Sequence, residues 1–283
     1  MTPGPLFKTA TGQPITTALV VASGAPTPGM QQQLMILFGT GQKNPISIAS
    51  AATYATATQS LYGVWDWNLK GWNSMSSAQY AAMTLASTGL SGFGTLSQAN
   101  LQAQTVTING STQNRDIATN ATICWASQSA CTGGAAQFGW YLNLPGNLEQ
   151  IIFNPQLVAQ ALTVNSVVPA VNSSTSCALQ GDTGFTYVLS AMTGGAFNEA
   201  FLPPSEAATG LSTNPAYADT QAIGIQTNAT GSSFITTNQA GTEFLVFETN
   251  HVASGSANLQ GGALGLNLPP NTVGRRLSWI EHR

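Results

Sequence analysis

Short runs of alternating or β-branched residues, each interrupted by Gly, Pro or Asn, recur throughout the chain and constrain its fold more than any other feature. The stretch 137–197 is the clearest example, with Gly-Trp-Tyr-Leu-Asn-Leu-Pro at 139–145 and Gly-Phe-Thr-Tyr-Val-Leu-Ser at 184–190. Such runs between turn-forming residues are typical of successive antiparallel strands. The sequence therefore predicts an all-β protein.

Other segments repeat this pattern on both sides of that stretch. Ile15–Val21 is rich in β-branched residues, and Leu34–Phe38 is a continuous apolar run, typical of a strand buried on both faces. Gln59–Asp66 is an aromatic strand, and its terminal Asp is expected to make a turn hydrogen bond. Leu101–Ile108 alternates with a period of two and is followed by Asn109-Gly110, a strong hairpin signal. Further strands are predicted at 222–226, 233–237 and 243–248.

One helix is predicted at Ser76–Ala86, where a Ser able to cap the first turn precedes good helix formers. It would form a short insertion between strands. The spacing of the strands fits a β-propeller with several four-stranded blades of about 40 to 50 residues each. It also fits a β-sandwich or a pair of sandwiches, and periodicity does not separate these architectures.

Charged residues make up only 6% of the 283 residues, and the formal net charge is -3. A folded chain with so few charges must stay soluble through Ser, Thr, Asn, Gln and Gly, which suits an exported protein. The 7 Lys and Arg residues form no basic patch, which argues against nucleic acid or an anionic membrane as a partner. No transmembrane segment is predicted. The start, Met1–Pro5, lacks the regions of a signal peptide, so either the protein is not exported or the chain is a fragment whose leader lies upstream. The Gly- and Pro-rich start favours a fragment of a longer protein.

Three cysteines are present, and two of them, Cys124 and Cys131, are close enough in sequence to close a small loop. A disulfide between them is predicted for an oxidising compartment. The alternative is a pair of buried free thiols that act as small hydrophobic residues. Cys177 is left odd and could pair with a residue outside this chain.

No catalytic, cofactor-binding or metal-binding residue is predicted. The acidic residues do not follow the spacing of a calcium loop, and no Gly-x-Ser-x-Gly elbow accompanies the two His residues. Trp65, Trp67 and Trp72 could stack on a ligand, but Trp clusters more often fill a core, and we favour that interpretation.

Several motifs, in their order along the chain, resemble the C-terminal domain of the PilY/PilC family of type IV pilus biogenesis and tip-adhesin proteins. The motifs are Ile15–Ala18, Leu37–Gln42, Gln59–Asp66, Gly139–Leu144, Val164–Pro169 with Cys177, and Arg276–Trp279. The resemblance runs from about Ile15 to Trp279 and therefore covers nearly the whole chain.

This resemblance implies that residues 1–283 form a single domain, the C-terminal portion of a modified β-propeller from a longer exported protein. It implies an extracellular location at the pilus tip or outer-membrane surface of a Gram-negative bacterium, with minor pilins and a host or abiotic surface as partners. The implied role is to promote pilus extension over retraction and to support surface attachment and twitching motility. Calcium is expected only in the upstream part of the parent protein, so this chain carries no cofactor.

The leading hypothesis is thus a non-enzymatic adhesin and pilus assembly module whose binding surface is formed by loops, at 45–58 and 202–220. A quinoprotein-like propeller dehydrogenase is an alternative, because 187–194 resembles the end of a blade in that class. The adjacent cysteines and acidic calcium ligands expected of such an enzyme are not found. A third alternative is a carbohydrate-binding propeller that uses the Trp cluster.

Overall fold

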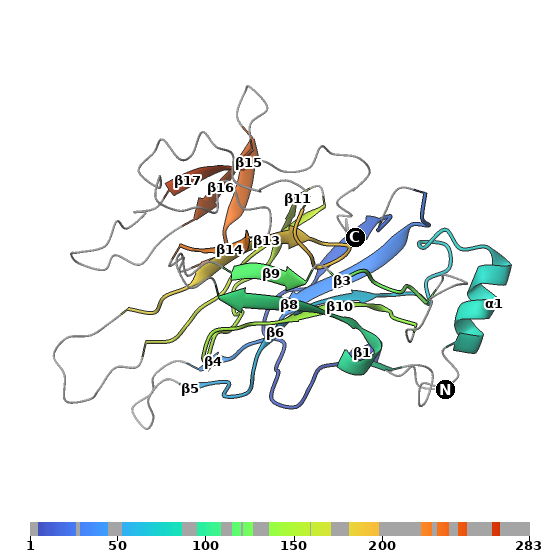
Figure 1. Cartoon of the computed structure of the whole chain (residues 1–283), viewed down its shortest axis with the longest axis horizontal. Helices are drawn as coiled ribbons and strands as arrows, with labels where there is room; N and C mark the ends of the chain where they lie inside the picture. The colour runs from blue at the N-terminus through green and yellow to red at the C-terminus, as the bar shows by residue number, and fades with distance from the viewer. Residues whose placement is uncertain are drawn as a thin grey trace, which may run out of the picture.

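Alternating and continuous apolar runs form strands throughout the computed structural model, as the sequence predicts for an all-β protein (Figure 1). The structure describes residues 5–26, 29–44, 53–86, 95–108, 115–119, 121–126, 136–158, 160–170, 181–197, 222–227, 231–237, 243–247 and 262–266. The strands of the first half are β1 Phe7–Lys8, β2 Val20–Gly24, β3 Gln33–Gly39, β4 Lys43–Asn44, β5 Thr53–Tyr54, β6 Ser60–Trp65, β7 Leu96–Ser97, β8 Gln102–Ile108, β9 Arg115–Thr119 and β10 Gly139–Asn143. Those of the second half are β11 Gln156–Val158, β12 Ala161–Asn165, β13 Phe185–Ser190, β14 Ala222–Gln226, β15 Phe234–Thr237, β16 Glu243–Phe247 and β17 Gly262–Leu266.

Ten of these strands form one sheet in the order β11-β12-β13-β14-β9-β8-β10-β6-β3-β2. The pair β8/β10 is parallel, and the other neighbouring pairs are antiparallel. Strands β15, β16 and β17 form a separate antiparallel sheet, and two short ladders, β1/β7 and β4/β5, complete the described strands. The division of the strands into four-stranded propeller blades stays a prediction.

The outer strands of the ten-stranded sheet, β2 and β11, lie in contact although no ladder joins them. The Ala18 backbone N–H donates to the Asn154 side-chain oxygen over 2.8 Å, just before β2 begins. This side chain links the two edges and satisfies a backbone donor that an uncovered edge would leave to solvent.

The helix α1, Ser77–Ala86, is the predicted insertion and lies at one end of the molecule in Figure 1. Its start is fixed by a reciprocal pair of bonds: the Gln79 N–H donates to Ser76 Oγ and the Ser76 N–H donates to Gln79 Oε1. This arrangement is a capping box, which satisfies two backbone donors that the helix itself leaves unpaired. A single 3-10 turn, η2 Gln98–Asn100, precedes β8.

The core lies along the central strands, which are buried on both faces. Every residue of β6 and of β12 is buried, and only the last residue of β13 is partly exposed. Trp140 of β10 fills the centre of this core and donates its indole N–H to the Ala191 carbonyl over 3.1 Å. Its ring packs so closely on Gly63 and Gly194 that a Cβ at either position would lie 2.3 Å or 2.2 Å from it. Two glycines therefore create the space for one large aromatic side chain.

A polar cluster is buried within this apolar core around the carboxylate of Glu149, which is 1% exposed. Its Oε1 atom accepts hydrogen bonds from Ser166 Oγ and from the Tyr187 hydroxyl, both over 2.7 Å. Its Oε2 atom accepts from the Gly146 N–H over 2.9 Å. Buried carboxylates are tolerated only when donors replace the lost water, as they do here.

Candidate functional site

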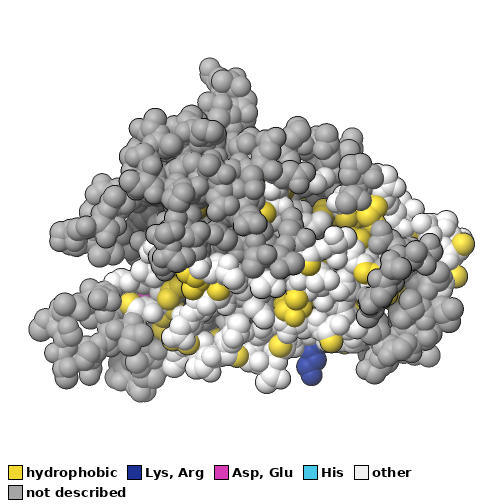
Figure 2. All heavy atoms as spheres, in the orientation of Figure 1, with side chains coloured by type: hydrophobic (Ala, Val, Ile, Leu, Met, Phe, Trp, Pro, Cys, Tyr) yellow, Lys and Arg dark blue, Asp and Glu magenta, His cyan; other side chains and the backbone are white. Residues whose placement is uncertain are grey.

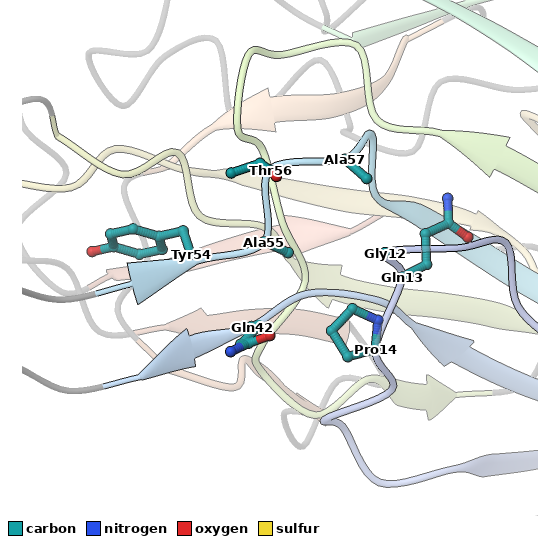
Figure 3. Close-up of a pocket in the computed structure, with 8 residues that line it drawn as sticks. All are labelled: Gly12, Gln13, Pro14, Gln42, Tyr54, Ala55, Thr56 and Ala57. Carbon is teal, nitrogen blue, oxygen red and sulfur yellow. The ribbon is translucent and has the colours of Figure 1, made fainter.

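A pocket opens between the turn at 11–14 and the segment that follows β5 (Figure 3). Its volume is about 490 Å³. The lining residues are Gly12, Gln13, Pro14, Gln42, Tyr54, Ala55, Thr56 and Ala57. Its described lining combines polar and apolar groups in a concave surface, so we take this pocket as the candidate site.

Gln59 joins the two walls of the pocket from behind. Its side-chain Nε2 donates to the Gly12 carbonyl over 3.0 Å and to the Ala57 carbonyl over 2.7 Å, and the residue is almost fully buried. Gly12 adopts a φ of +81°, and a Cβ there would lie 2.8 Å from the Ala57 Cβ. The turn at 11–14 therefore needs glycine at this position both for its backbone conformation and for its close approach to the opposite wall.

Gln13 anchors the same turn to the core. Its Nε2 donates to the Thr58 carbonyl over 2.8 Å and to Ser60 Oγ over 2.9 Å, and its Oε1 accepts from the Tyr62 hydroxyl. Burial raises the pKa of the Tyr62 phenol, and its hydrogen bonds partly oppose that shift. Tyr62 thus remains a neutral donor, and both N–H groups of the Gln13 amide are used within the chain, so this side chain has no donor left for a ligand.

Gln150 holds the third wall. Its Oε1 accepts from the Gln42 backbone N–H over 2.8 Å, and its Nε2 donates to the Ala55 carbonyl over 3.3 Å. The Gly41 N–H donates to the Pro14 carbonyl over 3.0 Å, which ties this wall to the turn. Three buried glutamines, Gln13, Gln59 and Gln150, therefore fix the shape of the pocket, and we refer to them as the framework glutamines.

The polar side chains that line the opening behave differently from the framework glutamines. The side chains of Gln42, Tyr54 and Thr56 form no hydrogen bond within the described part of the chain, and all three are at least partly exposed. Figure 3 shows Gln42 and Tyr54 extending in the same direction, with the Pro14 ring on the opposite segment. An amide and two hydroxyls are thus available to a ligand, beside the apolar surfaces of Pro14 and the two alanines.

One ion pair lies beside the pocket. Lys43, which pairs with Tyr54 in the β4/β5 ladder, donates from Nζ to the Asp182 carboxylate over 2.9 Å. This hydrogen bond raises the pKa of the Lys43 ammonium, and its partial burial opposes the shift. The pair neutralises the charge next to the opening. The face in Figure 2 likewise shows few charged side chains, as the composition requires.

The structure separates the three tryptophans that the sequence groups together. Trp65 and Trp67 are buried, at 0% and 7% exposure, and the Trp65 indole donates to the Asn73 side-chain oxygen. For these two residues the prediction of a core role is confirmed. Trp72 is 50% exposed, so for this residue the core prediction is wrong.

The reason for this separation is the turn at 66–75. Asn73 is buried and makes four side-chain hydrogen bonds: it accepts from Leu34 N and Trp65 Nε1 and donates to the carbonyls of Asp66 and Leu69. These bonds hold the turn in place and leave Trp72 outside the core. No described residue donates to the Asp66 carboxylate, so the turn hydrogen bond predicted for this side chain is not found. The Asn73 side chain makes the hydrogen bonds of this turn instead.

Some of the predicted cysteines and binding-loop residues lie outside the part of the chain that the structure describes. Cys124 is disulfide-bonded; Cys131 and Cys177 both lie outside the described residues, so the pairing of Cys124 with Cys131 stays a prediction. Of the predicted binding loops, residues 53–58 are described, and several of them line the pocket, whereas 45–52 and 202–220 are not described. Nothing in the sequence distinguishes the framework glutamines from surface glutamines, so the pocket itself was not predicted.

The described residues contain no group of three or more His, Cys, Asp or Glu side chains placed to hold a metal ion. In that same part of the chain, no helix has the length and apolar character that crossing a bilayer requires.

Fold and site together define a class: an all-β protein with a preformed, uncharged pocket. The chain is similar to a particular protein, the type IV pilus biogenesis factor PilY1 of Pseudomonas aeruginosa. The identity is 25% over 281 residues, or 96% of this chain, to PilY1 of both strain PAO1 and strain PAK. The crystal structure of the P. aeruginosa PilY1 C-terminal domain has a similar fold, with a TM-score of 0.58 and 20% identity over 94% of this chain. No family model matches the chain.

These comparisons confirm the resemblance to the PilY/PilC C-terminal domain that the ordered motifs predicted. The chain spans 21% of the length of the curated relatives and 48% of the chain in the crystal structure. The similarity therefore concerns only part of PilY1, and the activity of the whole PilY1 protein is a separate matter.

Proposed function

We propose that this chain is a non-enzymatic module of a type IV pilus biogenesis factor, which promotes pilus extension over retraction and supports surface attachment and twitching motility. The observation that carries this proposal is the 25% identity to PilY1 across 96% of the chain. The module would act outside the cell at the pilus tip, in contact with minor pilins and with a host or abiotic surface.

The chemistry of the described residues supports a binding role better than a catalytic one. The carboxylate of Glu149 is engaged by three donors inside the core, and Asp182 is paired with Lys43. General acid-base catalysis needs a titratable group that can reach a substrate. Glu149 is 1% exposed, and Asp182, whose side chain is 21% exposed, is held in an ion pair with Lys43. The pocket offers neutral hydrogen-bonding groups instead.

The proposal includes a modified β-propeller of which this chain is the C-terminal portion, forming a single domain over 1–283. The all-β content of the described residues and the fold similarity to the PilY1 C-terminal domain support the all-β part of this proposal, and the arrangement into blades rests on the resemblance alone. Calcium would be bound by the upstream part of the parent protein, and its removal would act on pilus extension through that part.

The test is deletion of the parent gene, followed by counts of surface pili and measurement of twitching. We expect both to fall, and to recover with the wild-type gene. A gene carrying Trp140→Ala, which removes the buried centre of this domain, should fail to restore them, whereas the exposed matched variant Trp72→Ala should succeed. Normal pili and twitching in the deletion strain would overturn the proposal, and quinone-dependent oxidation by the purified protein would contradict its non-enzymatic part.

A further inference from the structure

The pocket at 12–14, 42 and 54–57 combines a fixed frame with unoccupied hydrogen-bonding side chains. The framework glutamines bond the walls to one another and to the core. The lining side chains of Gln42, Tyr54 and Thr56 bond to nothing else in the described part of the chain. A preformed frame reduces the ordering cost of binding, so the free polar groups are ready for a ligand.

We propose that this pocket binds an uncharged saccharide unit. The inference goes beyond the proposed role in pilus biogenesis and does not depend on it, because it concerns binding by the pocket itself. The ligand is a neutral pyranose at an exposed end or branch of a glycan.

The absence of charge in the lining sets the class of ligand. Each lining residue that the structure describes is an uncharged type, and the adjacent Lys43 is already paired with Asp182. A phosphate, a carboxylate or a zwitterionic amino acid would lose water on entering and meet no counter-charge. A sugar ring carries hydroxyl groups that both donate and accept, which matches the amide of Gln42 and the hydroxyls of Tyr54 and Thr56.

The apolar part of the lining fits the same ligand. Pro14, Ala55 and Ala57 present C–H surfaces between the polar groups, and the C–H face of a pyranose can pack against them. The volume of about 490 Å³ lies within the usual range for small-ligand sites, about 300 to 1,000 Å³.

An unsatisfied acceptor lies behind the wall of the pocket. Gln59 Oε1 is buried and has no hydrogen-bond partner, although the Nε2 atom of the same amide bonds to both walls of the pocket. A buried carbonyl oxygen without a donor costs about 1 to 3 kcal/mol. Gln59 does not line the pocket, so this acceptor belongs to the frame and lies out of direct reach of a ligand.

The direct test measures binding of free sugars to the purified full chain by saturation-transfer NMR and calorimetry. The probes are the methyl glycosides of glucose, galactose, mannose and N-acetylglucosamine, with glucuronic acid and a neutral tripeptide for comparison. We expect at least one neutral glycoside to bind with a Kd below about 10 mM, and the two comparison probes not to bind. No binding by any glycoside, or tighter binding of glucuronic acid or the tripeptide, would overturn the proposal.

Substitutions in the pocket test whether the sugar binds there. Tyr54→Ala and Gln42→Leu should each weaken binding by about 3- to 10-fold, the equivalent of one lost hydrogen bond. Their melting temperatures should be unchanged, because neither side chain bonds within the described part of the chain. Trp72→Ala is the matched control, since this exposed aromatic residue lies on a separate turn. If Trp72→Ala weakens binding and the two pocket variants do not, the site is not this pocket and the proposal is wrong.

A second arm identifies the source of the sugar. Retention of the purified chain on surfaces coated with mucin-type glycans would indicate a host ligand, and retention on bacterial exopolysaccharide would indicate a ligand of the microbial community. Retention on neither surface would overturn the proposal for a glycan-linked unit. All these measurements use purified protein, so a failure here leaves the piliation test of the proposed function unaffected.

Discussion

Replacing Tyr187 with Phe tests whether the buried carboxylate of Glu149 is held by its donors. The substitution removes one hydroxyl and leaves the ring in place, and the side chains of both residues are almost fully buried. The lost bond is the 2.7 Å contact from the phenol to Glu149 Oε1. A hydrogen bond to a charged group contributes about 1.5 to 3 kcal/mol, and the carboxylate has no access to water as a replacement. We therefore expect Tyr187→Phe to lower the free energy of unfolding by about 1.5 to 3 kcal/mol.

The assay is urea unfolding of the purified chain, supported by thermal melts in which the midpoint should fall by about 3 to 10 °C. Tyr141→Phe is the matched control: its ring is half-buried and its hydroxyl has no partner in the described part of the chain, so the effect should stay within about 0.5 kcal/mol. Ser166 donates to the same oxygen as Tyr187, and the double variant with Ser166→Ala should be non-additive. A loss below about 0.5 kcal/mol for Tyr187→Phe would refute the reasoning.

Three other substitutions test separate parts of the structure. Gly194→Ala should destabilise the fold by about 2 kcal/mol or more, because the position has a φ of +68° and an added Cβ would lie 2.2 Å from the Trp140 ring; an unchanged urea midpoint would contradict this packing. Asn73→Ala removes four hydrogen bonds and should cost about 3 kcal/mol or more, with faster proteolysis of the turn at 66–75. Burial raises the pKa of the Asp66 carboxyl, so protonation favours the folded state and ionisation opposes it. The stability of wild type relative to Asp66→Asn should therefore fall as the pH rises from about 3 to 7, and a constant difference would show that this carboxyl is not desolvated.

Several strands could be predicted because their local pattern and their burial agree. The apolar run at 34–38 became β3, and the aromatic run at 59–66 became β6, since central strands buried on both faces need continuous apolar sequence. The helix could be predicted from its capping residues. The strand predicted at 15–21 was partly wrong, because regular pairing begins only at Val20. There, Thr16 Oγ donates to the Gly41 carbonyl and the Ala18 N–H donates to the Asn154 side chain, so hydrogen bonds to segments far away in the sequence take the place of a ladder.

The pocket could not be predicted from the sequence, and the physical reason is its dependence on long-range packing. Gln13, Gln59 and Gln150 are far apart in sequence, and their burial follows from a long-range arrangement of strands that no local pattern encodes. The exposure of Trp72 is similar: it depends on the turn fixed by Asn73 and on the left-handed backbone of Ser74, with a φ of 49°. Local sequence identified three tryptophans, and only the tertiary structure separates the two that pack from the one that does not.

The low number of charged residues explains both the framework glutamines and the uncharged character of the pocket. With 6% charged residues, the chain has few ion pairs with which to fix its loops, and it uses buried amides in their place. An amide can donate and accept at once, so one glutamine can join two or three backbone segments, as Gln59 and Gln13 do. Such a framework is uncharged over the whole physiological pH range and therefore has no net charge to attract or repel ions. A pocket built on it selects by shape and hydrogen bonding, which is why its free amide and hydroxyl groups favour an uncharged, hydroxyl-rich ligand.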